Sequence, residues 1–376
     1  KGVLLPDRDF REIDPADIGR VPGFGMREIV GYVPVQPDGS VRVEVPANVP
    51  LGLQLTDAQG RSLSGFHGGW LSVRPGETLT CNGCHNRDDE TPHGRPEAEP
   101  VSANPGAPVT GLPFNNTDPA LFADAGDTMA QLLTRSQPDR LMPSPDLVFE
   151  DVWTNPAVRT PDDAFTISYN DLDTERPIPT PVSGPDCIDE WTPLCRTVIH
   201  YLDHIQPIWE LPRMADVGGM MTDVTCSGCH SRRDDMNDLQ IPPAQLELTG
   251  EVSGEEPDNI VSYRELVFDD FEQDLVDGAL VDRLDPVLDD FGNPVFEPNE
   301  LGELIIDEFG DPLPVRAPVT LTPPMVAGSA FLSRFFDTFA TDGAHEGWLT
   351  EAELRLLNEW LDIGGQYYND PFAVPQ

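Results

Sequence analysis

Two short runs have the residue types and the spacing that covalent cofactor chemistry requires. They are Cys81-Asn82-Gly83-Cys84-His85 and Cys226-Ser227-Gly228-Cys229-His230, and together they use four of the six cysteines. Each has the form Cys-x-x-Cys-His, in which the two thiols bond the vinyl groups of one haem and the next imidazole binds its iron. The sequence therefore predicts two covalently attached haem c groups, with His85 and His230 as proximal ligands.

A single zinc site built from the two Cys pairs is the alternative use of these four thiols. It leaves both following histidines without a role, so haem attachment is the more economical interpretation. Haem c is attached outside the cytoplasm, and we therefore expect an exported protein, periplasmic or extracellular. In such a compartment the other two cysteines, Cys187 and Cys195, can pair, and we predict a disulfide between them.

The sixth ligand of each iron separates electron transfer from catalysis. A histidine closes the site at low potential, a methionine raises the potential, and an open position admits a substrate. For haem 1 we favour His93, with His67 as the alternative, and Arg95 is placed to pair with a haem propionate. Both histidines could instead be ordinary surface residues.

For haem 2 we predict His345, because it stands in a Gly-rich loop just before a capped helix that begins after Thr350. The competitors are His204, close in sequence to the second motif, and Met325, which follows two prolines. His200 and His204 share one helix face, so only one of them is expected to point at a haem.

Charge excludes several classes of partner. The chain has 23 Lys and Arg against 66 Asp and Glu, a net charge of −43 in 376 residues. Such a surface argues against nucleic acids and anionic membranes as partners. The carboxylates are spread along the whole chain, which favours adaptation to high salt over docking of a basic partner. No apolar run approaches the roughly 20 residues of a membrane span.

The hydrophobic pattern predicts an α+β protein with three parts. Residues 1–80 alternate apolar and polar side chains between turn signals, which predicts a small antiparallel β-sandwich leading into the first motif. Residues 81–185 are rich in Pro and Asp, and we expect a loop-rich segment that wraps haem 1 without a core of its own. Residues 186–376 are expected to form a mainly α-helical, cytochrome c-like domain around haem 2.

Three local features refine the expected C-terminal domain. Thr197 to Trp209 looks helical until Pro207. Thr350 and Glu353 form a capping box ahead of a leucine-lined helix that ends at Gly364-Gly365. From Glu251 to Val315 runs an acidic insertion, which is interpreted as a solvated loop because it lacks the ligand spacing of a calcium loop.

Three stretches resemble hydrazine-synthase-α-like multihaem proteins: Trp70 to His85, Val198 to Trp209, and Leu349 to Pro371. The resemblance implies a shared architecture with two covalent haems. In hydrazine synthase itself a tyrosine four residues beyond the histidine of the first motif binds the catalytic haem iron, and here that position is Asp89. This departure argues against carrying hydrazine chemistry over to this chain.

The expected function is electron transfer through two haems, with redox partner proteins and with a larger complex, a homo-oligomer or a filament as a possible setting. An enzyme is the second hypothesis, with an open sixth position at haem 1 for a small nitrogen, sulfur or peroxide substrate. A third is a scaffold in which the haems only hold the chain together. Binding of carbon monoxide or cyanide separates the first two.

Overall fold

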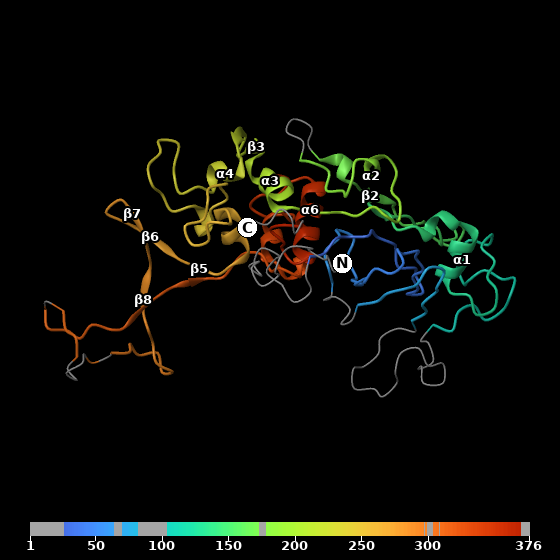
Figure 1. Cartoon of the computed structure of the whole chain (residues 1–376), viewed down its shortest axis with the longest axis horizontal. Coiled ribbons are helices and arrows are strands. Elements are labelled where there is room, and N and C mark those ends of the chain that lie inside the picture. Colours follow the sequence, from blue (N-terminus) through green and yellow to red (C-terminus); the bar gives the residue numbers. More distant parts are fainter. Residues whose placement is uncertain are drawn as a thin grey trace, which may run out of the picture.

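The computed structural model describes residues 26–63, 70–81, 104–172, 178–296, 298, 304–307 and 309–369. Short helices and two-stranded antiparallel sheets are mixed along these residues, in agreement with the α+β class (Figure 1). The helices are α1 (Met129–Ser136), η4 (Pro138–Leu141), η5 (Tyr169–Asp171), α2 (Asp186–Asp189), η6 (Tyr201–Ile205), α3 (Gln206–Glu210), α4 (Cys226–Cys229), η7 (Pro243–Gln245), α5 (Val261–Val267), η8 (Ala330–Leu332), η9 (Arg334–Thr338) and α6 (Glu351–Asp362). The strands are β1 (Leu147–Phe149), β2 (Phe165–Ile167), β3 (Met214–Val217), β4 (Met220–Asp223), β5 (Asp270–Phe271), β6 (Gln273–Val276), β7 (Ala279–Asp282), β8 (Leu284–Pro286), β9 (Arg316–Pro318) and β10 (Thr320–Leu321).

Helix α6 lies at the centre of the main hydrophobic core. It begins as predicted, since the Thr350 side chain accepts from the Glu353 amide at 3.2 Å and the Glu353 carboxylate accepts from the Thr350 amide at 2.8 Å. It ends before Gly364 and Gly365, which both have positive φ angles. Trp360 packs in a cluster of aromatic rings with Tyr201, Tyr263 and Tyr367.

The helix that was predicted from Thr197 to Pro207 both begins and ends later in the chain than predicted. It begins with one π-helical turn, η6, and continues through Pro207 as α3 to Glu210. Pro207 does not stop the helix because it stands in the first turn of α3, where its missing N–H is not needed. This unit buries Ile205, Ile208 and Trp209 in the main core.

The predicted N-terminal sandwich is not confirmed. The described residues from 26 to 80 contain no strand and pair only at isolated bridges, Ile29 to Thr197, Tyr32 to Ser144, Leu51 to Leu71 and Thr56 to Ser62. Four prolines within residues 34–50 remove backbone donors that a sheet would need. Alternating residues such as Val41 and Leu53 are about half exposed, so the alternation does not build a closed β core.

The middle segment has a small core, which corrects the prediction of a wrapping loop without one. Helix α1 is capped by Thr128 and Gln131 and buries Met129, Leu132 and Leu133 against Trp153 and two alanines. Strands β1 and β2 of the same segment pair with each other, with Leu147 opposite Ile167. Regular packing here arises from apolar residues that are sparse in the sequence but meet in space.

The acidic insertion is also more ordered than predicted. Its first part contains α5, which buries Tyr263, Leu266 and Val267 in the main core. Residues 269–322 are called the arm below. Those of them that the structure describes form β5 to β10 and extend away from the rest of the molecule (orange in Figure 1). The C-terminal part, residues 186–376, was predicted to be mainly helical, and the structure adds strands to the predicted helices there. In the part of the chain that the structure describes, no helix combines the length and apolarity needed to cross a membrane.

Candidate functional site

The second Cys-x-x-Cys-His run forms one helical turn, α4, which packs against α3. Cys226 is buried and Cys229 is exposed, and burial raises the pKa of the Cys226 thiol to about 11. Their i, i+3 spacing on this turn places the two sulfurs on the same side of the helix. The His230 amide donates to the Cys226 carbonyl at 2.8 Å, so the histidine directly follows the turn that carries the thiols.

His230 is oriented by one hydrogen bond. Its Nδ1 lies 3.1 Å from the Leu246 carbonyl oxygen, which can only accept, so the contact requires a proton on Nδ1 and leaves Nε2 with its lone pair. Burial also lowers the pKa of His230, which favours the neutral ring. A neutral imidazole with a donated Nδ1–H is the usual state of a metal-binding histidine.

The ring of His345 lies beside that of His230. The ring centroids are 6.3 Å apart and the ring planes are nearly perpendicular, at 89°. This separation is about the sum of two metal–imidazole bonds of about 2 Å each and the distance from each ring nitrogen to its ring centre. In length, the pair therefore suits two ligands of one metal ion. The structure brings these two predicted ligands together from segments 115 residues apart.

Packing fixes the loop that presents His345. Its ring stacks on Trp348, with centroids 4.2 Å apart and planes inclined by 21°, and Phe339 lies on another side. The His345 amide donates to the Thr338 carbonyl at 2.8 Å. Such contacts restrict the ring to a small range of orientations.

Arg213 joins the attachment segment to this loop, and sequence reasoning did not identify it. Its guanidinium forms a buried ion pair with Glu353 and donates to the Trp348 carbonyl at 3.1 Å. Glu353 is the same residue that caps α6. A lone arginine ten or more residues before a haem motif gives no signal in sequence, although the capping glutamate does.

The two competitors for haem 2 occupy other positions. His204 is buried, its Nδ1 accepts from the His200 amide at 2.9 Å, and burial lowers its pKa to about 4. Met325 is 1% exposed within the main core, and its amide donates to the Leu266 carbonyl. Within the described residues, the ring that contacts His230 is that of His345.

The first motif lies mostly outside the described residues. Cys81 is described and is exposed. The other predicted haem 1 residues fall outside the described ranges: Cys84, His85, His67, His93 and Arg95.

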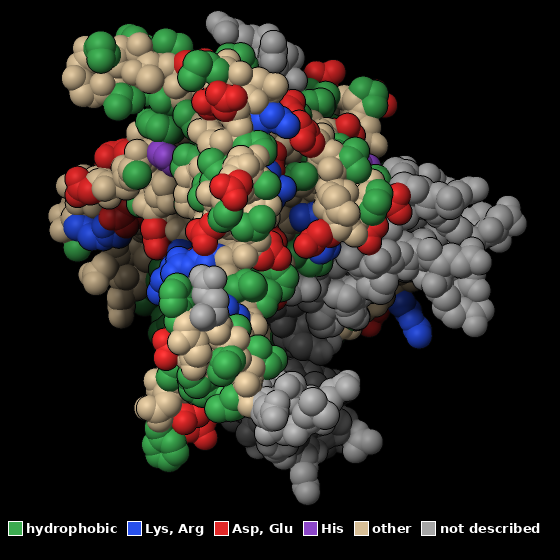
Figure 2. Space-filling model, turned by 90° about the vertical axis from the view of Figure 1, so that its left-hand side faces the viewer, with side chains coloured by type: hydrophobic (Ala, Val, Ile, Leu, Met, Phe, Trp, Pro, Cys, Tyr) green, Lys and Arg blue, Asp and Glu red, His purple; other side chains and the backbone are tan. Residues whose placement is uncertain are grey.

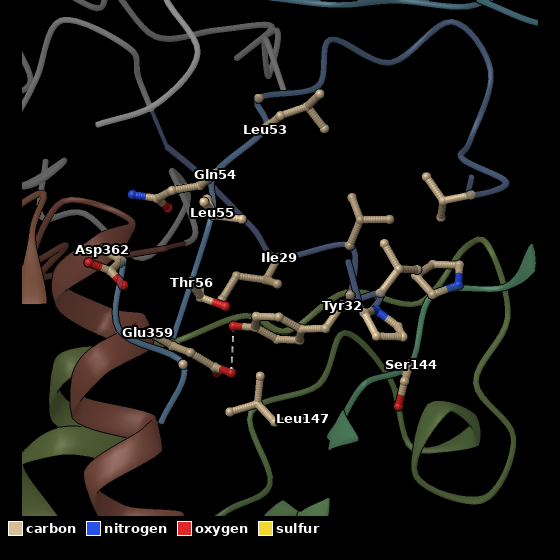
Figure 3. A pocket seen from close by; sticks show the side chains of 18 of the residues that line it. Ile29, Tyr32, Leu53, Gln54, Leu55, Thr56, Ser144, Leu147, Glu359 and Asp362 are labelled. Carbon is tan, nitrogen blue, oxygen red and sulfur yellow. Dashed lines mark hydrogen bonds between the residues drawn. The ribbon is translucent and has the colours of Figure 1, made fainter. Parts of the chain in front are cut away.

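A large apolar cavity lies where the N-terminal segments meet α6. Its volume is about 840 Å³. Valines and leucines from residues 33–63 and from β1 contribute much of its apolar wall, and Figure 3 shows Ile29, Leu53, Leu55 and Leu147 around it. Trp70 also contributes to the wall, and Leu71 pairs with Leu51 through two backbone hydrogen bonds just before the chain reaches Cys81.

One end of the cavity is polar. Tyr32 donates to the Glu359 carboxylate at 2.7 Å, as Figure 3 shows, and Tyr169 and Arg355 bind the same carboxylate. Burial raises the pKa of Glu359 well above its usual value, and the hydrogen bond from Tyr32 opposes this shift. Burial likewise raises the pKa of the neighbouring Asp362 to about 6. Glu359 and Asp362 both lie on α6, and nothing in the sequence indicated that their carboxylates are buried.

The predicted disulfide is confirmed. Cys187 and Cys195 are bonded, with their Cα atoms 5.7 Å apart. Among the described residues there is no group of three or more His, Cys, Asp or Glu side chains arranged to hold a metal ion. A haem iron needs only two ligands from the protein, fewer than such a group contains.

Comparison with known proteins relates the N-terminal part to one family. Residues 19–86 match the model of the hydrazine synthase alpha subunit middle domain. The match ends one residue after His85, so it contains the first motif and much of the cavity wall. It covers less than a fifth of the chain and supports a relation to hydrazine-synthase-alpha-like proteins. No curated protein and no solved structure matches the chain.

Proposed function

We propose that the chain is an exported dihaem c-type cytochrome that transfers electrons. The observation that carries the proposal is the placement of His230, at the end of the second attachment motif, beside His345. Bound haem c supplies one-electron iron chemistry. The protein residues would attach it through Cys226 and Cys229 and hold its iron between two neutral imidazoles. Arg213, Trp348 and Phe339 would keep the distal ring in place.

The first haem is proposed to occupy the apolar cavity. Its volume lies within the roughly 300–1,000 Å³ range of cofactor sites. Trp70 lines the cavity, and the chain continues from it through Leu71, which pairs with the lining residue Leu51, toward Cys81. Leu55→Trp, which fills part of the cavity, should reduce haem 1 incorporation. Leu313→Trp in the arm is the matched control and should not.

Export is supported by the disulfide, since such bonds persist in oxidising compartments. Redox partner proteins are part of the proposal, and the family relation supports a multi-subunit setting. The very acidic surface fits both high salt and a basic partner.

Covalent stoichiometry tests the cofactor proposal. Intact denatured protein should retain two haems by mass. Replacing Cys81 and Cys84 with alanine should leave one, and replacing Cys226 and Cys229 should leave the other. A double Cys187→Ser, Cys195→Ser variant controls for loss of thiols and should keep both. An intact chain that carries no haem or one haem would refute the proposal.

A second experiment tests the ligand pair. His345→Met should raise the reduction potential of one haem and leave that of the other unchanged. The reason is that a thioether ligand stabilises ferrous iron more than a second imidazole does. His204→Met is the matched control and should leave both potentials unchanged. If His345→Ala alters neither spectrum nor potential, His345 is not the ligand.

A haem enzyme is the second candidate, favoured by the match to a domain of hydrazine synthase, whose name denotes an enzyme, and by the large cavity. It requires an open sixth position at haem 1. Rapid binding of carbon monoxide or cyanide to one haem only would support it. Electron transfer predicts two haems that respond slowly or not at all.

A further inference from the structure

The arm leaves the core and returns to it at one place. Strand β5 pairs with β10, with Phe271 opposite Thr320, and the Met325 amide then donates to the Leu266 carbonyl at 3.1 Å. No described residue between positions 268 and 324 is buried. The arm is therefore a separate structural unit that contributes nothing to the main core.

The arm is nevertheless regularly hydrogen-bonded. Glu272, Arg283 and Val319 bind one another in a closed cycle, each amide donating to the next carbonyl at 2.7–3.0 Å. Three valines, Val287, Val295 and Val315, form a second cycle of the same kind at 2.8–2.9 Å. At both junctions three chain segments meet and satisfy their backbone groups without burying side chains. The arm is thus a branched β structure rather than a solvated loop.

Two of its turns repeat each other. Residues 289–294 read Asp-Asp-Phe-Gly-Asn-Pro and residues 307–312 read Asp-Glu-Phe-Gly-Asp-Pro. In each turn the first aspartate accepts from the amides two and four residues later, at 2.8–3.0 Å. The repeated geometry leaves the aromatic ring in solvent, since Phe291 is 90% exposed and Phe309 is 83% exposed. Two phenylalanines held this way by ordered turns lose hydrophobic stabilisation unless something covers them.

The rest of the arm is both apolar and acidic. Residues 269–322 contain 15 Asp and Glu and two Arg, a net charge of −13. Figure 2 shows hydrophobic and acidic side chains side by side on the face toward which the arm points. The large apolar side chains exposed on the arm are Phe271, Leu275, Val276, Val281, Leu284, Leu288, Phe291, Phe296, Leu304, Ile305, Ile306, Phe309 and Leu313.

We propose that the arm docks a basic protein, which receives Phe291 and Phe309 in apolar pockets and pairs its own Lys and Arg with the arm's carboxylates. Charge complementarity selects this occupant. A second copy of the chain would bring another −43 charges against the arm, and like charges in contact are strongly disfavoured. The inference does not depend on the haems.

Two synthetic peptides of equal length and charge test the chemistry of the partner. One alternates Lys with Leu and Trp, and the other alternates Lys with Ser and Gly. Titrated against the full haem-loaded chain at moderate ionic strength, the apolar peptide should bind at least about tenfold more tightly, because each buried aromatic ring adds roughly a factor of ten or more. Phe291→Ser with Phe309→Ser should abolish this preference and leave weak, salt-sensitive binding of both peptides.

Two controls make the test decisive. Phe122→Ser with Phe331→Ser removes exposed rings outside the arm and should leave the preference intact. A shortened arm, in which Asn-Gly replaces residues 272–319 as a hairpin turn between Phe271 and Thr320, should lose it. Persistence of the preference in the shortened chain would overturn the proposal. Equal binding of the two peptides to the native chain would also overturn it. A third refuting result would be a native dimer in sedimentation that dissociates when Phe291 and Phe309 are both replaced by Ser, because a second copy of the chain would then cover the rings.

Discussion

Helix α6 and the arm use charged residues in opposite ways. On α6, Glu353, Arg355, Glu359 and Asp362 are at most 4% exposed, although the segment reads as an ordinary amphipathic helix. In the arm, carboxylates are far more numerous and none of the described ones is buried. Charge density in the sequence thus gives no guide to where charge matters for the fold. The two regions differ in whether their charged side chains find buried hydrogen-bond and ion-pair partners in other parts of the fold.

The partners of α6 come from every part of the chain. Arg355 donates to the Ile167 carbonyl at 2.7 Å, pairs with Glu359 at 2.8 Å, and lies over the Tyr169 ring at 4.2 Å. Asp362 accepts from the Ser62 and Ala330 amides at 2.8 Å each. These long-range bonds connect the N-terminal, middle and C-terminal segments. In the arm, Arg283 instead pairs with the half-buried Glu272 and the exposed Asp285, both within the arm.

The largest difference between the two regions should appear on removing one arginine from each. Arg355→Ala leaves buried carbonyls and the Glu359 carboxylate without their cation, so unfolding should become easier by about 3 kcal/mol or more. Arg283→Ala removes a solvent-exposed guanidinium and should leave the free energy of unfolding nearly unchanged. Denaturant unfolding of both variants measures the difference. Equal losses would show that the α6 network does not stabilise the fold as its burial implies.

A smaller effect is expected from pH at the junction between the core and the arm. Glu265 of α5 is buried beside Arg232, Glu247 and Asp270, and burial raises its pKa to about 8. A carboxyl whose pKa rises on folding stabilises the folded chain fully below its ordinary pKa of about 4.5 and loses this contribution as pH rises toward 8. Because a single proton is involved, the free energy of unfolding can change by at most about 1.4 kcal/mol per pH unit from this titration.

Glu265→Gln tests this titration. The variant should show a flatter decline in unfolding free energy between pH 5 and pH 8 than the native chain. Glu272→Gln, in the arm, is the matched control and should follow the native curve. If Glu265→Gln and the native chain decline in parallel, Glu265 is ionised throughout this range and Arg232 alone compensates its burial.

What the sequence predicted well is local. The capping box at Thr350, the glycine end of α6 and the Cys187–Cys195 disulfide depend on neighbouring residues, and all three are confirmed. The structure places the His345 ring near that of His230, and the ligation of one iron by both stays a prediction.

What could not be predicted depends on distant partners. The Arg355–Glu359 pair looks like a surface i, i+4 pair in sequence, and only the Ile167 carbonyl and the Tyr169 ring make it a buried one. Alternation in residues 41–55 predicted a sandwich, yet these residues line a cavity and pair with other segments at single bridges. In the arm, the missed signal was available: the repeated Asp-x-Phe-Gly-x-Pro turn, 18 residues apart, marks a duplicated structure.

The smallest expected effect is on the salt dependence of the melting temperature, and it compares the charge of the arm with that of the rest of the chain. The native chain should melt at a higher temperature as salt increases from low to molar concentration, because screening relieves repulsion among its carboxylates. Replacing residues 272–319 with Asn-Gly removes 13 acidic and two basic residues, so the net charge changes from −43 to −32. Because no described residue of the arm is buried, the shortened chain should melt within a few degrees of the native one at high salt. At low salt it should melt higher than the native chain, since less repulsion remains. Thermal melts of both chains across one salt series measure this difference. A native melting temperature that is flat in salt would contradict salt adaptation and assign the acidity to docking alone.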